Sequence, residues 1–239
     1  MLLVLVMMKL SMFPFHNWMI FCYEKSSWEQ MFLMSSIMKF IPISFFCHFL
    51  EFWKVMLFIA MFNSIFMSIY VGIGFSLKKT IACSTSFNNF ILMYIFMLNT
   101  KQFVIFAVTY SMVLFSLTQL LSKFGCSKYF ILFNSKPAEY MFKIWVVIYS
   151  MIPMASSFIL KWNFVYEMLK FNSSMSFVYF LFLLSNLMMI WKYMLMIKKS
   201  FMTKASFTMK NEIPKVSMWM VLATFLFITL FVIFNFLSM

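Results

Sequence analysis

The sequence contains no arginine and no aspartate, and it has only 3 glycines and 6 acidic residues in 239 positions. Charged residues make up 10% of the chain, whereas hydrophobic residues make up 64% and aromatic residues 22%. A water-soluble domain normally carries about 25% charged residues, because its surface must be hydrated. The composition therefore excludes a soluble globular domain and predicts an integral membrane protein.

Cysteine is also scarce, and no two cysteines form a CxxC pair: the four are Cys22, Cys47, Cys83 and Cys126. Structural metal sites and haem attachment sites use closely spaced cysteine and histidine ligands. We therefore expect isolated thiols, with no metal or haem site in this chain.

Long apolar stretches are abundant. A helix needs about 20 mainly apolar residues to cross the hydrocarbon core of a bilayer. Hydropathy divides the chain into eight such segments, near residues 1–22, 30–50, 53–75, 80–98, 102–122, 138–162, 174–197 and 216–238. The prediction is an all-α membrane protein with about eight transmembrane helices, in a single transmembrane domain of residues 1–239.

The lysines that lie between these segments are unevenly distributed. Odd-numbered connections hold twelve: Lys25, Lys78, Lys79, Lys123, Lys128, Lys136, Lys143, Lys198, Lys199, Lys204, Lys210 and Lys215. Even-numbered connections hold three: Lys54, Lys101 and Lys170. Because basic loops stay on the side from which insertion starts, the pattern places the odd connections on that side and both termini on the other. The net charge of +13 is thus explained by orientation and lipid contact, without nucleic acid.

Four further lysines lie inside or at the margin of apolar segments: Lys9, Lys39, Lys161 and Lys192. Burying an ammonium at the bilayer centre costs about 2.5 to 3.5 kcal/mol on insertion scales, so such groups usually face a protein interior and mark an ion or proton path. The alternative is that the aliphatic stem lies in lipid and the charge reaches the headgroups. That alternative is strongest for Lys192, which lies near a predicted helix end, and weakest for Lys39.

Three of these lysines share a segment with a proline. The pairs are Lys9 with Pro14, Lys39 with Pro42, and Lys161 with Pro153. Proline removes a backbone hydrogen bond, and interrupted membrane helices are tolerated where they line a cavity or meet neighbouring helices. The pattern predicts helix breaks at these prolines, next to lysines that can exchange a proton more readily once they lose their hydration.

Four motifs resemble, in order along the chain, the antiporter-like subunit 2 family of mitochondrial NADH dehydrogenase. KLSMFPFHNW, from Lys9 to Trp18, is similar to the family's KLGxxPFHFW, and Lys39 followed by Pro42 stands at the spacing of its QKLAPI motif. GFSLKKTIACSTS is similar to LRKIxAYSS, which places Lys79 and Ser84 on matching positions. PMASSFILKW is similar to GLPPLTGFLPKW, which places Lys161 on the lysine of the second half.

The resemblance implies a fold with one complete and one truncated inverted repeat and two broken helices. Residues 1–50 would be the remnant of the first half-repeat, 51–200 the second repeat, and 201–239 the C-terminal loop and last helix. It further implies proton conduction through Lys9, Lys39 and Lys161 in the membrane arm of respiratory complex I. Flavin, iron–sulfur clusters and quinone are expected in other subunits.

Location and partners follow from the same resemblance. The chain would be a multi-pass protein of the mitochondrial inner membrane, with the odd connections in the matrix and the termini in the intermembrane space. Its expected partners are other membrane-arm subunits and lipids, including cardiolipin. His16, beside the first break, and Lys79 are candidate proton relays, although a lone histidine is more often a hydrogen-bonded structural residue.

The chain also departs from the family pattern. Phe21 stands where the family has an acidic residue, and Lys9 matches the seventh helix of the full plan, so the helices that carry the glutamate partner of Lys9 are expected elsewhere. Either a separate chain supplies these helices and a buried glutamate, or the first half-channel is lost and the subunit is structural. A free-standing cation transporter is disfavoured, because all six glutamates fall in predicted loops or near helix ends.

Overall fold

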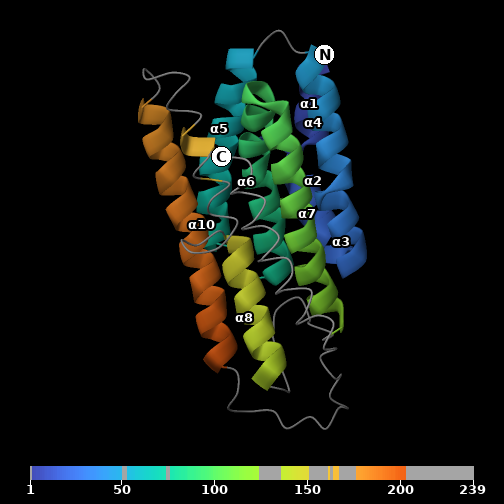
Figure 1. Cartoon of the computed structure of the whole chain (residues 1–239), viewed down its shortest axis with the longest axis vertical. Coiled ribbons are helices and arrows are strands. Elements are labelled where there is room, and N and C mark those ends of the chain that lie inside the picture. The colour runs from blue at the N-terminus through green and yellow to red at the C-terminus, as the bar shows by residue number, and fades with distance from the viewer. Residues whose placement is uncertain are drawn as a thin grey trace.

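The computed structural model describes residues 2–49, 53–73, 76–123, 136–150, 161, 164–166 and 176–202. These ranges contain helices and short connections and no strand, as the composition predicts. The longer helices run roughly along the long axis of the molecule (Figure 1). The helix bounds are α1 Leu2–Lys9, α2 Asn17–Lys25, α3 Trp28–Ser35, α4 Ile37–Phe49, α5 Trp53–Ile73, α6 Leu77–Leu98, α7 Thr100–Lys123, α8 Lys136–Ser150 and α10 Ser176–Met202.

Three helices in the described ranges are long and apolar enough to cross a membrane, judged by length and composition: Leu77–Met97 in α6, Thr100–Ser122 in α7 and Phe180–Ile197 in α10. Two shorter apolar helices are Phe58–Ile73 and Tyr140–Ser150. Four predicted segments coincide with α5, α6, α7 and α10 to within a few residues, whereas the predicted segment 216–238 lies outside the described residues. The count of eight spans stays a prediction.

Helix α6 is the centre of the described bundle. It packs against α2, α4, α5 and α7, while α10 packs against α5 and α8 (Figure 1). The protein buries 89% of the α6 span but only 28% of the α10 span. The polar side chains of α6 are therefore enclosed by protein, and α10 exposes most of its surface at the periphery of the bundle.

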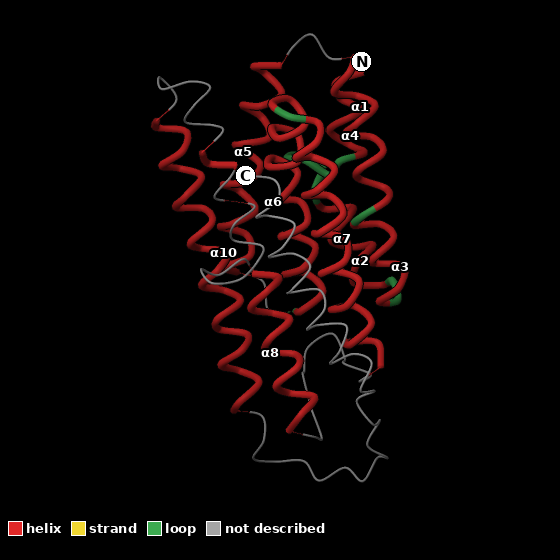
Figure 2. Tube along the Cα trace, in the orientation of Figure 1, coloured by secondary structure: helices red, strands yellow, loops and turns green. Residues whose placement is uncertain are grey.

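The first predicted break is present between α1 and α2. Residues 10–16 leave the helical path and form turns, which appear as a loop segment in Figure 2. Pro14 disfavours helical geometry at Phe13, and Ser11 adopts a φ of 53°, in the left-handed region that side chains other than glycine rarely enter. The Lys9-to-Trp18 motif thus encodes an interrupted helix, as its proline predicts.

The second predicted break lies at a different residue. Helix α3 ends at Ser35 and α4 begins at Ile37, with Ser36 between them at φ −104° and ψ −81°, while α4 continues through Pro42. The placement of a break at Pro42 was therefore wrong. A proline removes only one backbone donor, and the rest of the helical turn retains its hydrogen bonds. The break at Ser36 puts Lys39 in the first turn of α4.

The two interrupted segments form a hairpin. Its turn lies at Ser26 and Ser27, where Ser27 caps α3 through a reciprocal pair of hydrogen bonds with Gln30, and α1 packs against α4. The turn lies at the same end of the bundle as the start of α6, because Lys79 pairs with Glu24 there. Two odd-numbered connections thus lie at one end, which is the relative placement that the lysine distribution requires.

Candidate functional site

Helix α6 carries an unusual density of polar side chains for an apolar helix. Six of these are buried within two and a half turns: Ser84, Thr85, Ser86, Asn88, Asn89 and, one turn earlier, Thr80. Several hydroxyls donate to carbonyls three residues back in the same helix, as Ser84 does to Ile81 and Thr85 to Ala82, both at 2.8 Å. These bonds satisfy the hydroxyl protons and leave oxygen lone pairs that can accept from other elements.

Lys39 is buried against this polar helix and forms a hydrogen bond with it. Its side chain is 3% exposed, and its Nζ donates to Thr85 Oγ1 at 3.0 Å. Of the two carboxylates whose side chains the structure describes, Glu24 pairs with Lys79 and Glu29 is exposed. Within the described residues, Lys39 is therefore held by a neutral hydroxyl, which can accept its hydrogen bond without fixing its charge.

Lys161 is also buried, with a side chain that is 6% exposed, whereas the third buried lysine, Lys78, lies in the first turn of α6 and donates to the Ser26 carbonyl. The Lys161 Nζ donates to Asn186 Oδ1 of α10 at 2.6 Å and lies 5.2 Å from the centroid of the Phe87 ring of α6. The amide oxygen and the ring face both favour a cation without carrying a full negative charge. Lys161 is thus buried as predicted and has neutral partners, like Lys39.

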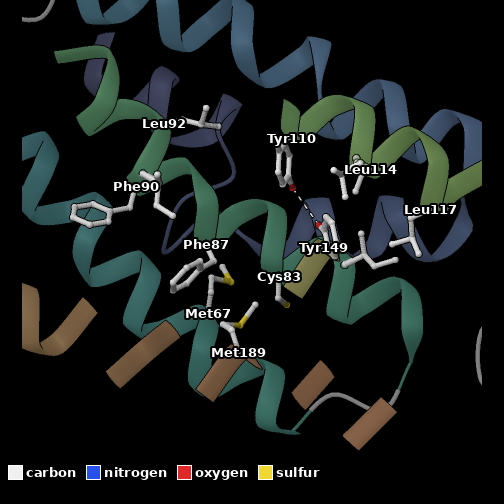
Figure 3. Packing of buried hydrophobic residues seen from close by; sticks show 14 of the residues in the cluster. Met67, Cys83, Phe87, Phe90, Leu92, Tyr110, Leu114, Leu117, Tyr149 and Met189 are labelled. Atoms are coloured by element: carbon white, nitrogen blue, oxygen red, sulfur yellow. Dashed lines mark hydrogen bonds between the residues drawn. The ribbon is translucent and has the colours of Figure 1, made fainter. Parts of the chain in front are cut away.

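Helix α6 lies between the two lysines. Thr85 contacts Lys39 and Phe87 contacts Lys161, and residues two positions apart in an α-helix point about 200° apart around its axis. On the Phe87 side of α6, the interior is filled by apolar side chains, among them Phe87 itself, Met67 of α5 and Met189 of α10 (Figure 3). A proton that moved between the two lysines would therefore have to pass around α6.

Lys9 does not lie in the interior of the described chain. It is exposed at the end of α1, on the same face as the exposed Leu5 and Met8, while Val6 and Leu10 face the bundle. Although the sequence predicts that Lys9 is buried within an apolar segment, the described part of this chain does not bury it. Hydropathy places a residue within an apolar segment, but the helical period of 3.6 decides which face it occupies.

His16 follows the first break and is 5% exposed. Its ring packs against Phe13, Phe66 and Tyr70, at centroid distances of 6.0, 5.1 and 5.6 Å. Its Nδ1 is buried and has no hydrogen-bond partner among the described residues. The surroundings are aromatic, so His16 is positioned by ring packing.

The remaining candidates lie at the turn end of the bundle or outside the described residues. Lys79 forms an ion pair with Glu24, 3.2 Å between Nζ and Oε1, and both side chains are partly exposed. Lys192 is partly buried and donates to the carbonyl of Gly72 at 3.2 Å. Pro153 and the break predicted there fall outside the described residues.

A set of side chains from α5 and α6 holds the first break, and we call it the break clamp: Asn63, Ser86 and Asn89. Asn63 Oδ1 accepts from the Phe13 N–H at 2.8 Å, Ser86 Oγ donates to the Ser11 carbonyl at 3.0 Å, and Asn89 Nδ2 donates to the Leu10 carbonyl at 2.7 Å. The clamp pairs backbone groups that the interruption leaves without helical partners.

Replacing Asn63 by leucine is expected to lower the free energy of unfolding by about 1–3 kcal/mol, because the partly buried Phe13 N–H loses its acceptor. Thermal unfolding of the purified protein in detergent would measure the loss. The exposed Asn17→Leu variant is the control for side-chain polarity. Equal stability of the two variants would show that the clamp does not hold the break.

Sequence reasoning identified Lys39 and Lys161 but not Thr85 and Asn186, their partners. The available signal was the placement of polar residues within apolar helices, such as Ser185 and Asn186 in the middle of α10. The described residues contain no group of three histidine, cysteine or acidic side chains that could hold a metal ion.

Comparison with known proteins gives one informative match. No family model matches the chain. The chain is 34% identical over 206 residues to the NADH-ubiquinone oxidoreductase chain 2 of Apis mellifera ligustica. The match covers 86% of this chain and 61% of the relative, so this chain spans less than two thirds of the length of that relative.

Proposed function

Because this chain belongs to the family of NADH-ubiquinone oxidoreductase chain 2 over the 206 matched residues, we propose that it is an antiporter-like subunit of the complex I membrane arm that conducts protons through Lys39 and Lys161. One observation carries the proposal: two buried lysines lie on opposite sides of a polar helix, and each is held by neutral groups. A neutral acceptor leaves the ammonium free to release its proton, whereas a carboxylate would stabilise the charged form.

The proposal also includes the location of the chain and the chemistry of the other subunits. The chain would lie in the mitochondrial inner membrane beside other membrane-arm subunits, with its odd connections in the matrix. Redox chemistry with flavin, iron–sulfur clusters and quinone would take place in those other subunits. Residues 1–50 and 51–200 would correspond to a half-repeat and a full repeat, with 201–239 as the C-terminal loop and last helix.

Lys9, His16 and Lys79 take secondary parts in this proposal. His16 and Lys79 are relays between the turn end of the bundle and the interior. Lys9 joins the path where a neighbouring chain covers the exposed face of α1 and brings a carboxylate to it. The alternative function is a structural subunit whose first half-channel is lost or is completed by a separate chain.

The test is the number of protons translocated per NADH oxidised by the complex in sealed vesicles, with Lys39 or Lys161 replaced by methionine. A lowered ratio in a fully assembled complex supports conduction through these lysines. An unchanged ratio for both variants would refute conduction and leave the structural role.

Cardiolipin is the lipid partner that we propose, and a groove between α2 and α3 can receive it. The groove has a volume of about 460 Å³ and is lined by Phe21, Cys22, Lys25, Ser26, Gln30, Leu33 and Met34. Lys25 supplies a cation, with its Nζ 4.2 Å from the centroid of the Phe21 ring, and the remaining walls are mostly apolar. A lipid phosphate beside Lys25 would pair with its charge, and acyl chains along Phe21 and Leu33 would contact the apolar walls.

Replacing Lys25 by methionine is expected to weaken cardiolipin retention severalfold, because the phosphate loses its cation. Lipid extracted from the purified complex and quantified per complex would measure it, with Lys101→Met as an exposed-lysine control of equal charge change. Retention that is the same in both variants would rule out this groove as the binding site.

A further inference from the structure

Four buried tyrosines converge beside α6 from four different helices, and we call them, with Ser84, the tyrosine cluster. Tyr23 comes from α2, Tyr110 from α7, Tyr149 from α8 and Tyr193 from α10, and none is more than 4% exposed. Tyrosine is amphipathic, and a buried phenol normally needs a hydrogen-bond partner. A group of phenols in a membrane interior is therefore costly unless it is connected.

Tyr149 is the hub of the tyrosine cluster. Its hydroxyl lies 2.8 Å from Ser84 Oγ and 3.2 Å from the Tyr110 hydroxyl, as Figure 3 shows for the two tyrosines. Since Ser84 already donates to the Ile81 carbonyl, the bonds run from Tyr110 to Tyr149 and from Tyr149 to Ser84. The Tyr193 ring meets the Tyr149 ring edge-on at a centroid distance of 5.7 Å. Hydroxyls from three helices are thus joined in one chain.

The cluster has two open ends. The hydroxyls of Tyr23 and Tyr193 are buried and make no hydrogen bond of normal geometry among the described residues, although Tyr23 lies near Thr85 and Ser35, and Tyr193 lies near Ser84 and Tyr149. Leaving a buried hydroxyl unpaired is energetically costly, so buried groups of this kind are usually paired with protein groups or with internal water. A water bound at each hydroxyl would extend the chain in two directions.

One direction leads to Lys39. Ser84, which Tyr149 contacts, is next to Thr85, the acceptor of Lys39. The Tyr23 hydroxyl lies near Thr85 and near Ser35, at the end of α3 just before the Ser36 break. The tyrosine cluster therefore adjoins the hydrogen bond that holds Lys39.

The other direction leads toward Lys161. Tyr193 and Asn186, the acceptor of Lys161, are seven residues apart on α10 and share one face, about 10 Å apart along the helix axis. Met189, which is 4% exposed, lies between them and faces Cys83 and Phe87 (Figure 3). A chain of two or three hydrogen-bonded waters would span about 10 Å. The side chain of Met189 lies in the way of such a chain, but its thioether is flexible and can adopt other rotamers.

We propose that the tyrosine cluster, completed by internal water, carries protons around α6 between Lys39 and Lys161, with Tyr149 as its hub. The inference rests on the proposed function of the two lysines. Each hydroxyl accepts a proton from the preceding donor as it gives its own proton to the next acceptor, so no tyrosinate accumulates. The lysine that releases the proton becomes neutral, and the lysine that receives it becomes an ammonium, which conserves charge along the path.

The test compares Tyr149→Phe with Tyr140→Phe, which removes the hydroxyl of an exposed tyrosine, 63% exposed at the start of α8. We expect a severalfold lower ratio of protons translocated per NADH in Tyr149→Phe and no change in Tyr140→Phe. Infrared difference spectra should also lose the bands of weakly hydrogen-bonded water in Tyr149→Phe, a readout that altered packing alone would not remove.

Lys39→Met, measured in parallel, separates the inference from the proposed function. A normal ratio in Tyr149→Phe with a lowered ratio in Lys39→Met overturns the role of the cluster and keeps the lysine path. A normal ratio in Lys39→Met removes the path itself. If Tyr149→Phe does not assemble, Ser84→Ala breaks the same hydrogen bond with a smaller change, and its ratio decides in the same way.

Discussion

Replacing Lys39 by methionine is expected to slow proton translocation by about 10²-fold or more, because it removes a proton-exchanging group from the path. The fold should be retained. Thr85 keeps its hydrogen bond to the Ala82 carbonyl after the ammonium is gone, so no buried group is left unpaired. Exchanging a buried charge for an apolar side chain of similar length is often neutral or stabilising.

Lys101→Met provides the control for Lys39→Met. Lys101 is exposed in the first turn of α7, and its replacement changes the net charge of the chain by the same amount. Translocation is measured as acidification of sealed vesicles during NADH oxidation, and assembly as the amount of intact complex. A Lys39→Met complex that assembles and acidifies vesicles at the control rate would show that Lys39 is only a structural cation.

Changes at Asn186 are expected to have the second largest effect, and two replacements act in opposite senses on stability. Asn186→Leu removes the acceptor of the Lys161 Nζ and leaves an ammonium beside the Phe87 ring, which costs about 1–3 kcal/mol or more for a charged group. Asn186→Asp supplies a carboxylate, which pairs with Lys161 and holds its proton. Both variants should slow translocation about tenfold or more.

Thermal unfolding and vesicle acidification together distinguish these cases. The expected order of stability is Asn186→Asp above Asn186→Leu, with slow translocation in both. Asn17→Leu, at an exposed site on α2, controls for loss of an amide. Rapid translocation in Asn186→Asp would mean that Lys161 does not need a neutral partner, contrary to the proposed mechanism.

The sequence predicted the buried lysines better than their surroundings. Lys39 and Lys161 were predicted in the interior because each lies in an apolar segment, and both are buried. Lys9 satisfied the same criterion but lies on an exposed face of α1, since hydropathy does not tell which face of a short helix meets the bundle. The direction of a side chain is set by tertiary packing.

Of the two helix breaks that the structure describes, the sequence predicted the position of one correctly and that of the other wrongly. Pro14 predicted the interruption after Lys9, because proline and the preceding residue restrict the backbone locally. Pro42 gave a wrong position, since the interruption lies at Ser36, where no proline marks it. The partners Thr85 and Asn186 are 46 and 25 residues away from the lysines they contact, so the pairings depend on how α6 and α10 pack.

The tyrosine cluster could not have been predicted from local patterns. Its members come from α2, α6, α7, α8 and α10, and single tyrosines within apolar segments are common in membrane helices. Only the folded arrangement brings Tyr110, Tyr149 and Ser84 within hydrogen-bond distance. It is the tertiary packing around α6 that places these hydroxyls next to one another.

The most direct test of the account is a double-mutant cycle on proton translocation with Lys39→Met, Lys161→Met and the combined variant. If both lysines belong to one path, the combined variant should lose no more translocation than the more severely affected single variant, because either change already interrupts the path. Losses that multiply in the combined variant, or a combined variant that pumps normally, would contradict a single path through Lys39 and Lys161.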